Sequence, residues 1–186
     1  MSPRIIFNLH LVLGYVAWIL CTNIYILPRL KAMSRINAQC AIASLHSFRF
    51  FGLVFILPGV VGNNLPAGFA QLAAYGDLAT GLLAILALAT VRMRPLFWPL
   101  VVGFNLVGTI DLFVGYYHGV LLGLPARSGE LGAAYAIVII YVPLLMITHF
   151  IAFYLLLRRQ PLPTMPSPLP EYLVVPGSGE SQNRYR

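Results

Sequence analysis

Five long apolar segments, separated by short breaks, dominate the chain. They cover residues of about 5–27, 41–61, 70–91, 96–118 and 133–157. Each is close to the roughly 20 residues that an α-helix needs to cross a bilayer. The breaks contain turn-forming and charged residues, as in Gly62-Asn63-Asn64-Leu65-Pro66 and Arg92-Met93-Arg94-Pro95. The pattern predicts an all-α membrane protein with five transmembrane helices in one bundle.

The composition agrees with this class. Hydrophobic residues make up 59% and charged residues 9% of the 186 residues, and the mean hydropathy is +0.82. Such a chain is not a soluble globular domain, and the lipid bilayer is its expected surroundings. The net charge of +7 comes from Lys and Arg residues at the helix ends, so it does not indicate a nucleic-acid partner.

Two parts of the chain differ in composition. Residues 1–159 contain all five apolar segments and form the predicted transmembrane domain. Residues 160–186 are rich in proline and polar residues, and cannot bury a core. We predict that they form a disordered tail in the cytoplasm.

Basic residues lie mainly on one side of the predicted bundle. These are Arg29, Lys31, Arg35, Arg92, Arg94, Arg158 and Arg159, whereas Arg4 and Arg127 flank the other side. Lys and Arg concentrate in cytoplasmic loops of membrane proteins. The N-terminus is therefore expected outside and the C-terminus in the cytoplasm.

Two aspartates lie inside the apolar segments. Asp77 is 15 residues from Arg92 and Asp111 is 16 residues from Pro95, so both lie roughly 22–24 Å from the basic ends of their helices. Arg49, Asn105 and His149 lie at roughly 12–15 Å by the same count, with His46 just below them. Ionisable residues within a membrane are candidates for function.

Helical spacing places these polar residues on faces that also contain small residues. The faces comprise His46, Arg49 and Gly52; Ala73, Asp77, Gly81 and Ala84; and Asn105, Gly108, Asp111, Gly115 and His118. Small residues allow membrane helices to approach closely. We therefore expect these faces to meet inside the bundle.

A polar site made of His46, Arg49, Asp77, Asn105, Asp111 and His149 follows from this placement. We expect Arg49 to neutralise one aspartate and the other to take up a proton or hold a cation. Asn105 and His149 would orient a small polar ligand, and a proton-linked binding or transport role would suit the site.

One alternative is a closed ion-pair network that only fixes helix packing. The protein would then be a non-catalytic membrane subunit or assembly factor. Five helices without a visible inverted repeat also suggest a second copy or a membrane partner for any transport role.

A second alternative is a haem-binding redox protein. The four histidines form a pair near the outer surface, His10 with His118, and an inner pair, His46 with His149. Two axial histidines must lie at one depth, and by helical rise each pair is mismatched by about 6–7 Å. No segment has metal-ligand spacing, nucleophile motif or phosphate-binding loop, and this disfavours an enzyme.

Several short motifs resemble those of small uncharacterised bacterial inner-membrane proteins. They are Leu45-His46-Ser47-Phe48-Arg49, Pro58-Gly59-Val60-Val61, Leu65-Pro66, Tyr75-Gly76-Asp77-Leu78 and Phe104-Asn105 with Gly108-Thr109-Ile110-Asp111. An arginine-led helix followed by an acidic, Gly/Ala-rich helix is also similar to DoxX-like membrane proteins. The first resemblance implies a multi-pass protein of the bacterial inner membrane and implies no reaction.

The charge distribution predicts the topology. A reporter that is active only in the cytoplasm, fused after Arg159, should be active, and the same reporter fused before Met1 should be silent. The reverse pattern would contradict the predicted orientation.

Overall fold

A computed structural model describes residues 1–158 as an all-helical bundle. Its elements are α1 (Pro3–Cys21), the π-helix η1 (Thr22–Ile26), α2 (Leu27–Ala32), α3 (Arg35–His46), the 3₁₀-helix η2 (Ser47–Ile56), α4 (Ala67–Ala89), α5 (Arg94–Leu121), the 3₁₀ segment η3 (Leu124–Ala134), the π-helix η4 (Ile137–Tyr141) and α6 (Val142–Leu157). The predicted tail at 160–186 lies outside the described residues.

Five helical stretches are long and apolar enough to span a membrane. They are Pro3–Ala32, Arg35–Ile56, Ala67–Ala89, Arg94–Leu121 and Ile137–Leu157. This confirms the predicted all-α membrane fold with five spanning helices, while the orientation of the termini stays a prediction.

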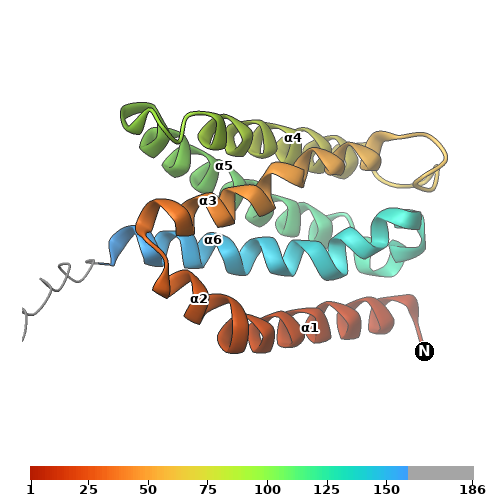
Figure 1. The fold of residues 1–186 in the computed structure, drawn as a ribbon. Coiled ribbons are helices and arrows are strands. Elements are labelled where there is room, and N and C mark those ends of the chain that lie inside the picture. The colour runs from red at the N-terminus through yellow and green to blue at the C-terminus, as the bar shows by residue number, and fades with distance from the viewer. Residues whose placement is uncertain (159–186) are drawn as a thin grey trace, which may run out of the picture.

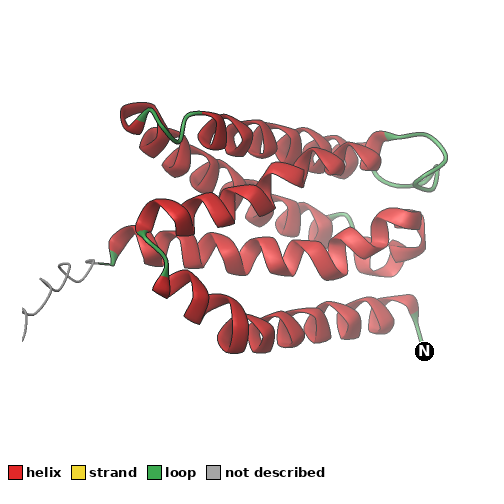
Figure 2. Cartoon of the chain, viewed as in Figure 1, coloured by secondary structure: helices red, strands yellow, loops and turns green. Residues whose placement is uncertain are grey.

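The helices run roughly in one common direction and stack in layers (Figure 1). α4 and α5 pack against each other, α3 with η2 crosses α4, and α1 lies on the far side against α6. One end of the bundle, here called the basic end, contains the α2–α3 and α4–α5 connections and the end of α6. The opposite end, here called the loop end, contains the N-terminus, the 57–66 loop and η3 (Figure 2).

The core consists of apolar layers with a polar layer between them. One large cluster of buried residues lies toward the basic end and includes Ala43, Ala84, Phe104 and Ile151. A second lies toward the loop end and includes Phe55, Ala74 and Val138. Most buried polar positions lie between the two clusters along their helices: His46 and Arg49, Asp77 and Thr80, Asn105, and Thr148 and His149. Gln39 of α3 is buried within the first cluster.

Proline shapes two of the spans. The π-helices η1 and η4 end two residues before Pro28 and Pro143. Proline cannot donate a backbone hydrogen bond and would clash with the carbonyl four residues earlier. In η4, a backbone carbonyl accepts from another helix: Trp18 Nε1 donates to Ile140 O at 2.8 Å. This bond ties α1 to the span that contains η4.

The 3₁₀ conformation of η2 aligns the polar face of the second span. Side chains three residues apart eclipse one another in a 3₁₀-helix. Arg49, Gly52 and Phe55 are therefore buried in one row, while Phe48 and Phe51 are 62% and 57% exposed. The hydropathy pattern predicted one helix over this span and does not reveal this row.

Close packing of α1 depends on Gly14. A Cβ atom at Gly14 would overlap the backbone oxygen of Ile139, which cannot rotate away, whereas a Cβ at Gly103 in α5 would meet no atom within 4 Å. Gly14→Ala should therefore destabilise the protein by about 1–3 kcal/mol. The matched control, Gly103→Ala, should be neutral or slightly stabilising because alanine favours helix.

Thermal unfolding of both variants in detergent checks this prediction. Equal melting temperatures for Gly14→Ala and the wild type would contradict the close contact between α1 and η4.

Candidate functional site

A fully buried arginine lies at the centre of the polar layer. The Arg49 Nε atom is 2.6 Å from Asp77 Oδ1, and Nη2 is 2.5 Å from Asp111 Oδ2. η2, α4 and α5 supply the three side chains. The predicted pairing of Arg49 with an aspartate is thus observed, but the expectation that it pairs with only one is wrong. The fork of a guanidinium has donors enough to reach both carboxylates.

A directed chain of hydrogen bonds leads from Arg49 to α6 and back to α5. Arg49 Nη1 is 3.4 Å from Gly108 O and 3.3 Å from His149 Nε2. A guanidinium only donates, so His149 Nε2 accepts and carries no proton. The other ring nitrogen, Nδ1, then donates to Asn105 Oδ1 at 2.9 Å, and Asn105 Nδ2 donates to Val101 O at 2.8 Å. His149 is therefore a neutral imidazole with a fixed tautomer.

His46 adjoins this chain through stacking. Its ring centroid is 4.1 Å from that of His149. The hydroxyl of Thr148 donates to the backbone oxygen of Leu144, so it accepts from His46 Nε2 at 3.0 Å. In the described part of the chain, the buried Nδ1 atom of His46 has no hydrogen-bond partner. The sequence analysis did not single out Thr148, whose role depends on contact between α3 and α6.

The structure corrects one depth estimate. The predicted mismatch of His46 and His149 is wrong, because α3 begins at Arg35 and not near residue 41. His46 lies 11 residues from Arg35, and His149 lies nine residues from Arg158, at the end of α6. The two rings therefore reach similar depths and stack.

The geometry of the inner histidine pair does not fit a haem held between His46 and His149. Both ring nitrogens of His149 are engaged, and its contact with His46 leaves no space for an iron atom. His10 Nδ1 lies 2.9 Å from Tyr135 OH, and His118 Nδ1 donates to Val114 O of its own helix. Within residues 1–158, no group of three or more His, Cys, Asp or Glu side chains is placed to hold a metal.

Three glycines create the space that the polar cluster occupies. A Cβ at Gly52 would overlap the carboxyl group of Asp77, and one at Gly76 would overlap that of Asp111. At Gly108, a Cβ would lie 2.5 Å from His149 Nε2 and 2.6 Å from Arg49 Nη1. The sequence analysis placed Gly52 and Gly108 on polar faces but did not give Gly76 a role. Gly76 directly precedes Asp77 and was not assigned to the polar face, so its contact with Asp111 of α5 was not predicted.

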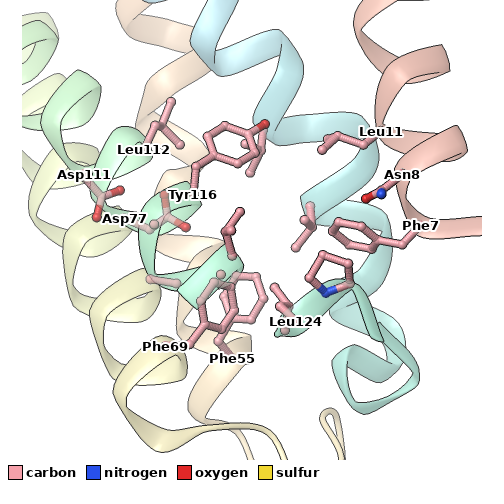
Figure 3. A pocket seen from close by; sticks show the side chains of 17 residues that line it. Phe7, Asn8, Leu11, Phe55, Phe69, Asp77, Asp111, Leu112, Tyr116 and Leu124 are labelled. Carbon is pink, nitrogen blue, oxygen red and sulfur yellow. The ribbon is translucent and has the colours of Figure 1, made fainter. Parts of the chain in front are cut away.

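A cavity of about 130 Å³ adjoins the two carboxylates (Figure 3). The side chains of Asp77 and Asp111 are each 11% exposed, and both line this cavity. The remaining lining is mostly apolar and includes Phe7, Phe55, Phe69, Leu112, Tyr116 and Leu124. Arg49, Asn105 and both inner histidines lie behind the carboxylates and do not line it.

Each carboxylate has one oxygen without a hydrogen-bond partner in the described chain. Arg49 binds Asp77 Oδ1 and Asp111 Oδ2, and no hydrogen bond reaches Asp77 Oδ2 or Asp111 Oδ1. Neither of these oxygens is among the buried atoms that lack a partner, so both retain some accessible surface. Asp77 Oδ2 lies against Gly52 and Asp111 Oδ1 lies against Gly76, and the two aspartates line the cavity beside them.

Comparison with known proteins places the chain in a family. A family model described as "Domain of unknown function (DUF8737)" matches residues 6–157. The chain belongs to this family. The match covers the five spans except the first three residues of the first one, and it includes the whole polar cluster. It does not bear on the resemblance to DoxX-like proteins. No curated protein and no solved structure matches the chain significantly.

The ion-pair arrangement predicts a large cost for removing the arginine. Arg49→Ala leaves two carboxylates in the bundle without a counter-charge and should destabilise the protein by about 3–5 kcal/mol. Asn105→Ala removes one neutral acceptor and should cost about 1–3 kcal/mol. Thermal unfolding of detergent-purified variants measures both.

The triple variant Arg49→Gln/Asp77→Asn/Asp111→Asn separates charge from packing. It removes all three charges together, so it should be more stable than Arg49→Ala. Small and equal losses for Arg49→Ala and Asn105→Ala would contradict an ion-pair core.

Proposed function

We propose that this membrane protein binds a proton or a small cationic solute at Asp77 and Asp111, as the basis of proton-linked binding or transport. The observation that carries the proposal is that Asp77 and Asp111, each with one oxygen that has no hydrogen-bond partner in the described chain, both line a cavity within the bundle. Arg49 binds the two carboxylates, His149 accepts from Arg49, and Asn105 holds His149 in place. The bacterial inner membrane is the proposed location.

Formal charge supports the proposal. Two ionised carboxylates and one guanidinium leave a net charge of about −1, and the tautomer of His149 adds none. An uncompensated charge within a membrane protein is costly. One additional positive charge, from a proton or a cation, balances the cluster.

The geometry lets this charge exchange. Each aspartate keeps one oxygen bound to Arg49, its second oxygen accepts no hydrogen bond within the described chain, and both residues line the cavity. Gain or loss of a cation at the free oxygens leaves the contacts to Arg49 in place. Movement of solute across the membrane would in addition require an opening toward the basic end, which a second copy or a membrane partner could provide.

A structural role is the second candidate function. Arg49 is contributed by η2 and contacts residues of α4, α5 and α6, so the cluster links four spans. A non-catalytic subunit or assembly factor would use this network only to fix the packing of its helices.

Difference infrared spectroscopy tests whether a proton occupies the pair. The chain has only five acidic residues, Asp77, Asp111, Glu130, Glu171 and Glu180, so carboxyl bands can be assigned by substitution. We expect a protonated-carboxyl band that titrates while the protein stays folded and that disappears in Asp77→Asn/Asp111→Asn.

Glu130→Gln is the matched control. Glu130 accepts hydrogen bonds from Asn64 at the loop end, away from the cluster, so its removal should leave the band unchanged. If no band depends on Asp77 or Asp111 and their single Asn variants alter only stability, the structural role replaces the proposed one.

A further inference from the structure

The cavity beside the two carboxylates is polar at one end and apolar along the rest of its length. On α4 its lining residues are Phe69, Ala73 and Asp77, and the aspartate is the one nearest the basic end. On α5 they run from Asp111 to Val120, and again the aspartate is nearest the basic end. Both carboxylates therefore lie at the end of the cavity that is nearest the basic end of the bundle.

Aromatic side chains surround the remaining space. Phe7, Phe55, Phe69 and Tyr116 come from α1, η2, α4 and α5 (Figure 3). Phe55 and Phe69 contact edge to face, with centroids 5.8 Å apart. Apolar cavities with such linings hold benzene-sized groups: a cavity of about 150 Å³ in another protein binds benzene. The present cavity, of about 130 Å³, has a similar size.

We propose that this cavity binds a small arylalkyl-ammonium cation. This inference rests on the proposed function, because it takes the charge-accepting oxygens of Asp77 and Asp111 as the site for the ammonium group. Its N–H groups would donate to Asp77 Oδ2 and Asp111 Oδ1, and its ring would lie among the aromatic side chains. Its single positive charge would balance the net charge of about −1 on Arg49, Asp77 and Asp111.

The proton balance follows from this charge match. Before binding, one carboxyl group of the pair holds a proton. Binding of the cation R–NH₃⁺ forms hydrogen bonds to both carboxylates and displaces that proton to solvent. One positive charge replaces another, so the net charge of the occupied cluster does not change.

Exposed residues at the edge of the cavity indicate how the ligand would reach the carboxylates. Asn8 of α1 and Val120 of α5 line the cavity and are exposed, Val120 by 74%. Toward the basic end, a hydrogen bond of 2.8 Å between Tyr15 OH and Tyr116 OH joins the same two helices. The exposed lining residues therefore lie on α1 and α5 near the loop end, and the tyrosine pair joins these two helices.

Three benzyl compounds test the proposal. Benzylammonium, benzyl alcohol and benzoate share the ring and differ in charge and hydrogen bonding. Binding to the detergent-purified full chain is measured by titration calorimetry. We expect benzylammonium to bind at least about tenfold more tightly than benzyl alcohol, since charge-assisted hydrogen bonds are stronger than neutral ones, and benzoate not to bind.

Two variants distinguish the polar and apolar parts of the site. Asp111→Asn keeps the Arg49–Asp77 pair and should remove the preference for benzylammonium over benzyl alcohol. Gly115→Leu should prevent binding of both compounds, because Gly115 lines the cavity and a Cβ there meets no atom within 4 Å. Gly103→Leu, at an equally open position that does not line the cavity, is the matched control and should bind as the wild type does.

The outcomes separate the two proposals. If benzylammonium binds no better than benzyl alcohol, or if Gly115→Leu binds it as well as Gly103→Leu does, the arylalkyl-ammonium assignment is wrong. The carboxyl infrared band would then still support the proposed function. Loss of that band, when benzylammonium is added to the wild type but not to Gly115→Leu, would support proton displacement.

Discussion

One buried guanidinium determines how this bundle is arranged. A charge inside a membrane protein is tolerated only when it is paired and hydrogen-bonded. Arg49 meets this requirement with Asp77, Asp111, His149 and the backbone of Gly108, which lie on three other helices. Displacing any of these helices would leave a buried charge without its partner. The apolar clusters on either side fill space, whereas this interaction specifies which helices meet and at which depth.

The contacts of Arg49 depend on three glycines that leave room for its partners. Gly52, Gly76 and Gly108 leave room for the carboxyl groups and for the imidazole, and any Cβ there would occupy the same space. The 3₁₀ geometry of η2 keeps Arg49, Gly52 and Phe55 in one row. Arg49 binds the carboxylates, Gly52 leaves room for Asp77, and Phe55 lines the cavity. Specificity of packing and access to the carboxylates therefore come from the same residues.

The excess of negative charge connects this packing to function. A purely structural ion pair needs one carboxylate per guanidinium, and here there are two, both from residues that line a cavity. The second carboxylate adds a desolvation cost that packing alone does not require. In the proposed function, a proton or cation at the two carboxyl groups offsets this cost, and the aromatic lining is the reason for proposing an organic cation.

The sequence by itself determined the membrane class, the five spans and the polar residues that lie within them, because hydropathy and charge are properties of local segments. Helical spacing also placed Arg49, Asp77, Asn105 and Asp111 on faces that meet. Only the tertiary structure decided that one arginine bridges both aspartates, that His46 stacks on His149, and that Gly76 makes space for Asp111. These relations depend on helix starts, on the 3₁₀ geometry of η2 and on contacts between distant segments, none of which is encoded in the periodicity of a single helix.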